Sequence, residues 1–169
     1  MAGLIRSWWW GGDPDVKNEV SGMTLRDVHN VQQSWKTIQK NSNPNGFLMF
    51  FRLFDAEPET KLFFKNLAHV HTEEEMAANV VFRAHIINIM SSLDNSIINL
   101  NKPELVVAWM QKLGDSHRRH RIEKRHFWVF KDVLVKILQD DLKFPEEVVE
   151  SWGRYVTFIY DHLLSRLAS

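Results

Sequence analysis

Cysteine is absent from the 169-residue sequence, which excludes disulfide bonds, thiolate nucleophiles and metal sites built on cysteine. There is also no Asn-x-Ser/Thr glycosylation motif, and no apolar run approaches the roughly 18 residues that a membrane-spanning helix requires. Arg6 interrupts the apolar stretch at the N-terminus, so that stretch lacks the core of a signal peptide. These absences predict a cytoplasmic protein.

An excess of charge of either sign is also missing. Lysine plus arginine and aspartate plus glutamate each total 21, which gives a formal net charge of zero. Nothing global therefore attracts nucleic acid or an anionic membrane. One basic run does occur, at Arg118, Arg119, His120, Arg121, Lys124 and Arg125. No aromatic residue interleaves with it, which favours a solvated corner of the protein over a nucleic-acid site.

Turn-forming residues are few, with 7 glycines and 5 prolines, and no alternation of apolar and polar residues indicates strands. Apolar residues recur instead at spacings of three and four from Met23 onward, which is the spacing of amphipathic helices. The pairs Thr24 with Asp27 and Thr72 with Glu75 resemble capping boxes, which mark helix starts. The sequence therefore predicts an all-α protein.

We expect about seven to eight helices. The expected segments are a helix that begins near residue 24 and is broken by residues 41–46, an apolar helix over residues 47–54, a short helix from Pro58, one long helix over residues 73–97, and helices over residues 103–117, 124–139 and 145–167. A chain of this length can bury the core of a single domain. We place that domain at residues 23–169, after an irregular extension of residues 1–22.

The extension combines Leu4 and Ile5 with three adjacent tryptophans, Trp8, Trp9 and Trp10. Such residues suit a membrane interface or a groove on a partner protein. They would equally suit packing of the extension onto the surface of the domain. The Gly-Gly-Asp-Pro sequence at residues 11–14 is typical of a turn. These alternatives and a disordered extension all stay open, as does assembly of the chain into a homo-oligomer.

Two of the eight histidines lie on apolar helix faces, whereas we expect the other six at the surface. For His126, which stands beside Phe127, the edge of a pocket is the alternative. His117 ends one apolar stripe and His85 lies within another. The other residues of these stripes are Val106, Met110 and Leu113, and Val81 and Ile89. A single core-facing histidine is more often a hydrogen-bonded structural residue than a ligand. Two of them on separate long helices indicate a group bound between them.

Zinc is one candidate for that group. A zinc site, however, normally has three or four protein ligands, commonly including carboxylates or cysteines. The side chains that share the stripes of His85 and His117 are valine, methionine, leucine and isoleucine instead. An apolar cleft with one imidazole nitrogen on each side fits an iron porphyrin better.

From Met23 onward the sequence resembles the globins. The segment at residues 52–60, Arg-Leu-Phe-Asp-Ala-Glu-Pro-Glu-Thr, is similar to the proline corner between the second and third globin helices, and Trp35 lies where the first helix carries a tryptophan. The resemblance implies that haem b is the cofactor and that His117 is the proximal iron ligand. It makes His85 the distal residue, with sixth-ligand binding left open. The haem contacts that it implies are Phe64, Ile89, Leu113, Ile122 and Phe127, with Phe50 in the distal pocket.

The function that the resemblance implies is reversible binding of O₂ and other diatomic gases, for storage, transport or supply. Haem redox chemistry, such as NO dioxygenase or peroxidase-like activity, and haem-based gas or redox sensing remain alternatives. The chain is thus not expected to be an enzyme, although that role stays open. Phe50 replaces the leucine common at its position. Because this larger ring narrows the space in which His85 would approach the iron, it favours a five-coordinate ferrous state.

Overall fold

Helices follow one another from Leu25 to Leu164 in the part of the chain that the computed structural model describes, residues 10–167. Within that part, seven α-helices are joined by short turns, two 3₁₀ segments and one π-helical turn. The elements are α2 (Leu25–Gln39), α3 (Ser42–Ala56), η1 (Pro58–Phe63), η2 (Lys65–Leu67), α4 (Glu73–Ala78), α5 (Val80–Ile98), α6 (Pro103–Arg119), α7 (Lys124–Lys136), η3 (Ile137–Asp141) and α8 (Glu146–Leu164). The predicted all-α class is confirmed.

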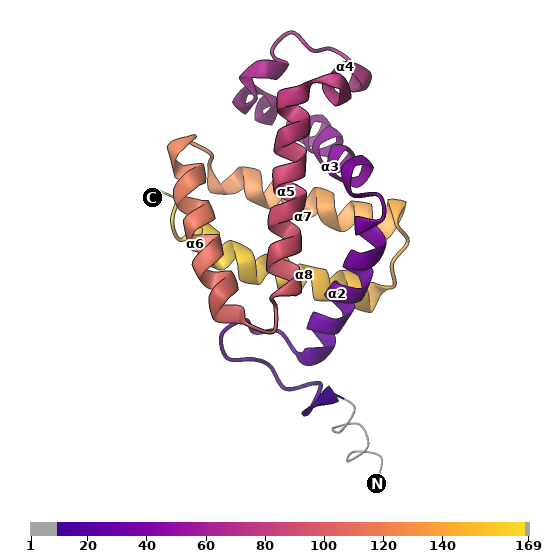
Figure 1. Cartoon of the computed structure of the whole chain (residues 1–169), viewed down its shortest axis with the longest axis vertical. Coiled ribbons are helices and arrows are strands. Elements are labelled where there is room, and N and C mark those ends of the chain that lie inside the picture. The colour runs from indigo at the N-terminus through magenta and orange to yellow at the C-terminus, as the bar shows by residue number, and fades with distance from the viewer. Residues whose placement is uncertain (1–9, 168–169) are drawn as a thin grey trace.

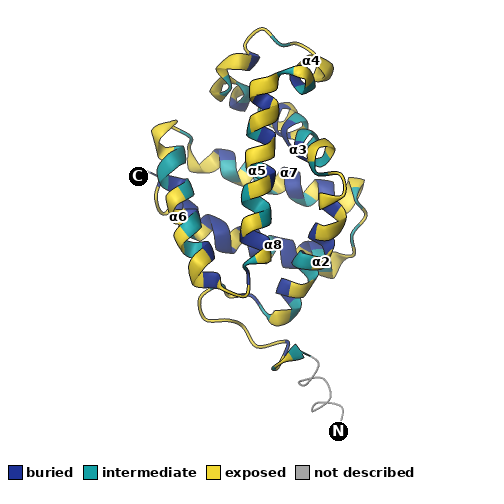
Figure 2. Ribbon diagram, viewed as in Figure 1, coloured by how far each residue is buried: buried dark blue, intermediate teal, exposed yellow. Residues whose placement is uncertain are grey.

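The helices form two layers, and α5 and α6 lie in front of α7 and α8 in the view of Figure 1. The closest packing joins α8 to both α2 and α6, and joins α3 to both α5 and α7. Helices α5 and α6 are not among the pairs that pack closely. The buried residues lie on the inward faces of the helices, most continuously along α8 (Figure 2). Helix α8 is therefore the support on which α6 rests.

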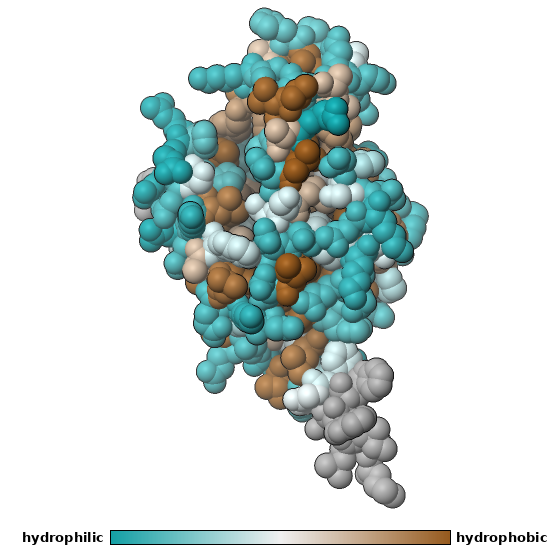
Figure 3. Space-filling model, in the orientation of Figure 1, coloured by the Kyte–Doolittle hydropathy of each residue, from teal (hydrophilic) through white to brown (hydrophobic). Residues whose placement is uncertain are grey.

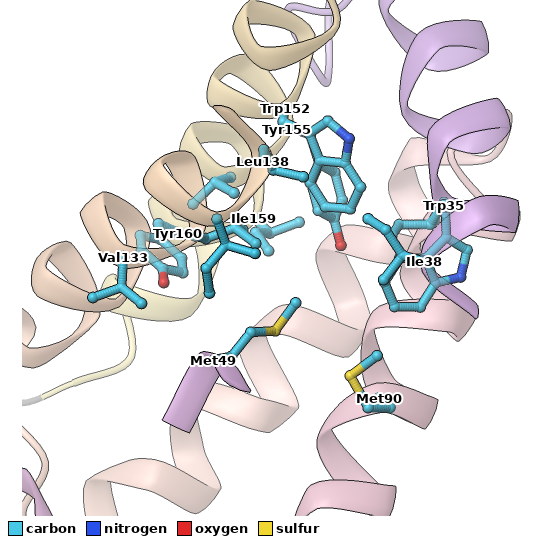
Figure 4. Close-up of a cluster of buried hydrophobic side chains, with 14 of the residues drawn as sticks. Trp35, Ile38, Met49, Met90, Val133, Leu138, Trp152, Tyr155, Ile159 and Tyr160 are labelled. Atoms are coloured by element: carbon cyan, nitrogen blue, oxygen red, sulfur yellow. The ribbon is translucent and has the colours of Figure 1, made fainter. Parts of the chain in front are cut away.

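The core beneath these helices is aromatic and fully hydrogen-bonded at its polar ends. Trp35, Trp152 and Tyr155 are almost completely buried, and Figure 4 shows them converging from α2 and α8. The indole nitrogen of Trp152 donates to the Ser34 hydroxyl over 2.8 Å, and that of Trp35 donates to Asp94 over 2.8 Å. Since unpaired buried donors are costly, these bonds allow tryptophan to fill the core without a penalty.

Both predicted capping boxes are confirmed. The Thr24 hydroxyl accepts from the backbone of Asp27, and the Thr72 hydroxyl accepts from that of Glu75. The single long helix predicted over residues 73–97 is wrong, because the chain bends at Asn79. The side chain of Asn79 accepts from the backbone N–H of Phe82 over 3.0 Å and starts α5 as a new helix.

The predicted break at residues 41–46 is wrong from Ser42 onward, since α3 already begins there. Pro44 lies in the first turn, where its missing N–H costs no hydrogen bond. Gly46 lies where α3 crosses α5, and a Cβ atom on it would approach the Ile86 side chain to 2.6 Å. The local sequence is typical of a turn, but close packing between two helices decides its structure.

The described part of the extension, residues 10–22, hydrogen-bonds to the start of α2. The backbone N–H of Arg26 donates to the Pro14 carbonyl over 3.3 Å, and that of Asn18 donates to the Met23 carbonyl over 2.9 Å. The Trp10 ring lies edge-on to His29, with centroids 5.1 Å apart. Leu4, Ile5, Trp8 and Trp9 lie outside the described residues. Between residues 10 and 167, no helix is both long and apolar enough to cross a membrane.

Candidate functional site

His117 is positioned by the tight seating of α6 on α8. One face of α6 buries Val106, Met110 and Gly114. A Cβ atom at position 114 would collide with the backbone carbonyl of Leu163 in α8. Only glycine therefore permits this approach of the two backbones. The approach fixes the position and rotation, relative to α8, of the last turn of α6, which carries His117.

The imidazole of His117 has one nitrogen engaged by the backbone. Its Nδ1 lies 2.9 Å from the Leu113 carbonyl oxygen, one helical turn earlier. Because a carbonyl can only accept, Nδ1 carries the proton, and in the neutral ring Nε2 keeps its lone pair. Burial lowers the pKa of His117, with a further lowering from His120, although the Leu113 hydrogen bond opposes them. A neutral imidazole with a backbone-anchored Nδ1 is what a metal-binding histidine needs.

His85, on α5, is held by rings instead of hydrogen bonds. The Phe64 ring centroid lies 4.9 Å from that of His85, and the Phe50 centroid lies 5.6 Å away, both edge-on. No hydrogen bond joins the His85 ring to another residue of the described range. Burial lowers the pKa of His85, and the nearby His117 and His120 lower it further. The two histidines thus lie within electrostatic reach of each other, and both are kept neutral.

The contacts of His85 belong to a larger group of phenylalanines. We call it the His85 ring cluster; it consists of His85 with Phe47, Phe50, Phe51, Phe54, Phe64, Phe82 and Phe130. Neighbouring centroids are at most 5.9 Å apart, within the range of favourable ring pairs. The cluster joins α3, α5 and α7 to Phe64, which lies between η1 and η2. Two of its rings pack edge-on against His85.

The sequence interpretation missed the buried Phe82 at the centre of this cluster. It assigned Val81 to the stripe of His85, but Val81 is exposed, as is Val80. Apolar atoms over the end of α5 nearest α4 are visible at the surface in Figure 3. Phe82 precedes His85 by three positions, so the helical spacing was available as a signal. The start of a separate helix at Asn79 was not.

A second set of rings begins at His117. We call it the His117 ring cluster; it consists of His117, Phe127, Tyr160 and Trp128. The successive centroids are 5.3, 5.5 and 5.4 Å apart. Tyr160 is buried, which raises the pKa of its phenol, and Trp128 is 40% exposed. The cluster runs from His117 on α6 to Phe127 on α7, then to Tyr160 on α8, and returns to α7 at the exposed Trp128. Only Phe127 of these three partners was predicted.

The residues predicted to contact a cofactor share an intermediate degree of burial. None is fully buried and none is exposed: Phe64, His85, Ile89, Leu113, His117, Ile122 and Phe127. The apolar ones pack against the core, apart from Ile122 in the turn between α6 and α7. Phe50 is buried. Apolar walls with one free imidazole nitrogen fit a flat, apolar cofactor that contains a metal ion. Within residues 10–167, no three acidic or histidine side chains gather as a metal site.

His126 was expected at the surface, and that expectation is wrong. Its side chain is 6% exposed; Nδ1 accepts from the Glu123 backbone over 3.1 Å and Nε2 faces Glu59 at 3.3 Å. Its neighbour Arg125 pairs with Glu57, Glu59 and Glu123. Arg125 and His126 therefore tie the start of α7 to η1, and the charge of Arg125 is paired within the protein.

Known proteins are similar to this chain in sequence and in fold. A family model described as Globin matches residues 48–163. Cytoglobin-2 of Oryzias latipes is 27% identical over 138 residues, which cover 79% of this chain and 76% of that protein. Globin-1 of Anadara inaequivalvis is 26% identical over 146 residues, or 86% and 97% of the two chains. The solved structure of a hexa-coordinate haemoglobin from Drosophila melanogaster has a TM-score of 0.79 at 21% identity and is similar over 87% of this chain and all of that one.

Proposed function

The chain belongs to the globin family, whose members hold haem and bind diatomic gases with it, and from that premise we propose that His117 is the proximal iron ligand of a protein that reversibly binds O₂. Storage, transport or supply of O₂ would be its role. The observation that carries this proposal is the 2.9 Å contact between His117 Nδ1 and the Leu113 carbonyl. It orients the ring and leaves Nε2 free for iron. The cofactor proposed is haem b.

His85, on the α5 side of the site, would act on the gas. Its pKa is lowered by burial, so the ring is neutral near pH 7 and one of its nitrogens carries a proton. That N–H would donate a hydrogen bond to O₂, which gains partial negative charge when it binds. Phe50 and Phe64 contact the ring and hold it in place. Together with Ile89 they would keep water from the site, while Leu113, Ile122 and Phe127 would line the proximal side.

Replacement of each histidine by alanine tests the assignment. His117→Ala should abolish stable haem binding, because it removes the bond between protein and iron. His85→Ala should retain haem, because His85 acts on the gas. The measurements are haem-to-protein ratio and Soret absorbance after reconstitution, with far-ultraviolet circular dichroism of both haem-free variants to show that they fold. Haem retention by the His117 variant at the wild-type level would refute the proposal.

A second candidate function is favoured by the structural similarity to a hexa-coordinate haemoglobin. If His85 itself bound iron in the ferrous state, redox chemistry or sensing would become the better assignment. The contact of His85 with the bulky Phe50 ring argues against this, because Phe50 narrows the space in which His85 would approach the iron. We therefore expect five-coordinate ferrous haem.

Stopped-flow CO binding to the ferrous protein separates the two candidates. A five-coordinate site gives a rate that rises linearly with CO concentration. A rate that saturates in the wild-type protein, and no longer does so in His85→Leu, would show that His85 must first leave the iron. That result would replace the O₂-storage assignment with the second candidate.

A further inference from the structure

We propose that Trp128 and Tyr160 conduct single electrons from a small reductant at the protein surface to haem held at His117. This inference rests on the proposed haem binding. The His117 ring cluster supplies the path. Between His117 and Trp128, the centroid of each ring lies 5.3 to 5.5 Å from that of the next. Electron transfer weakens steeply with distance, so a sequence of touching rings favours it over one long step.

The composition of the clusters singles out this path. The His85 ring cluster contains phenylalanine alone besides the histidine, and phenylalanine is not oxidised under biological conditions. The buried rings of Trp35, Trp152 and Tyr155 contact one another. None of those three has a ring contact with His117 or Phe127 among the described residues. In the described range, oxidisable rings are therefore joined to a site histidine through Phe127, on the α6 side.

Loss of a proton stabilises an oxidised aromatic residue, so it decides which residue of the path carries the radical. Oxidised tyrosine releases its phenolic proton, but burial raises the pKa of Tyr160 and opposes that release. Trp128 is 40% exposed, so its indole can release a proton to water. The ammonium group of Lys131 lies 5.3 Å above the Trp128 ring and disfavours a cation there. A neutral tryptophan radical at position 128 is the expected resting place, and Tyr160 passes the electron on.

We assign the docking of the reductant to a surface hollow that is linked to Trp128 through Lys131, which contacts the Trp128 ring. Lys131 also lines this hollow of about 590 Å³ between residues 17–22 and α8, a volume in the range of small-molecule sites. Lys17, Arg154 and His162 line it too, along with Glu19, Glu150 and Asp161. The mixture of charges suits a small polar donor, such as a phenol or an enediol.

The electrons balance with hydrogen peroxide as the oxidant. Peroxide takes two electrons and two protons and becomes two molecules of water. Bound haem would supply the site for this two-electron reduction, and Tyr160 and Trp128 would deliver the two electrons to it one at a time. Each time, the Trp128 indole loses one electron and its N–H proton. The donor then gives the indolyl radical a hydrogen atom, so two donor molecules are each oxidised by one electron per peroxide.

The test is electron paramagnetic resonance of the ferric, haem-loaded protein, frozen after mixing with peroxide without a donor. Ring-deuterated tryptophan identifies a tryptophan radical by its altered hyperfine splitting. We expect that signal in the wild-type protein, its loss in Trp128→Phe and its reduction in Tyr160→Phe. Trp10→Phe is the matched control and should leave the signal unchanged. Trp10 is also partly exposed, and among the described residues its ring interactions are with His29 and Arg26 on α2.

Ascorbate is the donor probe. Its peroxide-dependent oxidation should slow in Trp128→Phe and not in Trp10→Phe. An undiminished tryptophan signal in Trp128→Phe, with the haem absorption band intact, would overturn the electron path and leave the proposed function standing. Absence of a haem band in the wild-type protein before peroxide is added would overturn both.

Discussion

The α5 side and the α6 side of the site hold their histidines by different means. His85 has ring contacts and no hydrogen bond within the described residues, whereas His117 is fixed by the Leu113 carbonyl and by the seating of α6 on α8. The phenylalanines that contact His85 offer no competing donor or acceptor. A backbone acceptor at His117 instead sets which nitrogen is free. Apolar contacts thus suit a residue that tunes a gas, and a directional bond suits one that binds iron.

Removing a ring from the His85 cluster should have the largest effect on stability. Phe82→Ala should lower the free energy of unfolding of the haem-free protein by about 3–5 kcal/mol, because it opens a cavity where several aromatic rings meet. Phe127→Ala, at a half-buried ring of the other cluster, should cost clearly less. Urea unfolding of both variants measures the difference. Equal losses would mean that the two sides are packed alike, contrary to the comparison.

The seating of α6 is the next most sensitive feature. Gly114→Ala should destabilise the protein by about 3 kcal/mol, since the added Cβ collides with the backbone of α8. It should also weaken haem binding, because α6 must shift with His117. Gly153→Ala is the matched control: that glycine is also helical and has open space around it, so alanine should stabilise by up to about 1 kcal/mol. Thermal melting and haem titration check both. Normal stability of the Gly114 variant would show that α6 is not tightly seated.

How far the sequence predicts these features depends on whether the cause is local. Thr24 and Thr72 mark helix starts through bonds to residues three positions away, and both starts were predicted. His85 and His117 were found because helical spacing places them on apolar faces. The ring contact between Phe127 and Tyr160 joins residues of two helices. No spacing along the chain encodes it, so Tyr160 and Trp128 were missed.

The errors have the same origin. The residues around Gly46 are typical of a turn, but contact with Ile86 across a helix crossing places them in α3. His126 follows the basic run and was expected at the surface, yet it is buried and paired with Glu59 and the Glu123 backbone. In each case the deciding partner is a residue of another element or a capping bond that composition does not reveal.

The hydrogen bond from His85 should appear in gas binding. His85→Leu replaces the imidazole with an apolar side chain of similar bulk and so removes the N–H. This change should weaken O₂ binding by about 1.5–3 kcal/mol, or roughly tenfold to a hundredfold. CO is less polar and should be affected less. Oxygen dissociation rates by stopped flow measure the effect, with CO as the internal control. An equal change for both gases would indicate that His85 acts through its size.

The smallest effect expected is a pH dependence of the haem-free protein. Burial is the main cause that holds the pKa of both His85 and His117 below the ordinary value of 6.5. Above pH 6.5 both histidines are neutral in the folded and the unfolded chain and contribute no difference. Below it, the unfolded chain binds protons that the folded chain does not, so stability falls as the pH falls. The fall ends once both folded histidines are protonated.

Urea unfolding at steps between about pH 7.5 and pH 5 measures the slope. The double variant His85→Leu/His117→Leu should show a shallower slope than the wild type. An unchanged slope would place the responsible groups outside the site and would contradict the lowered pKa of the two histidines.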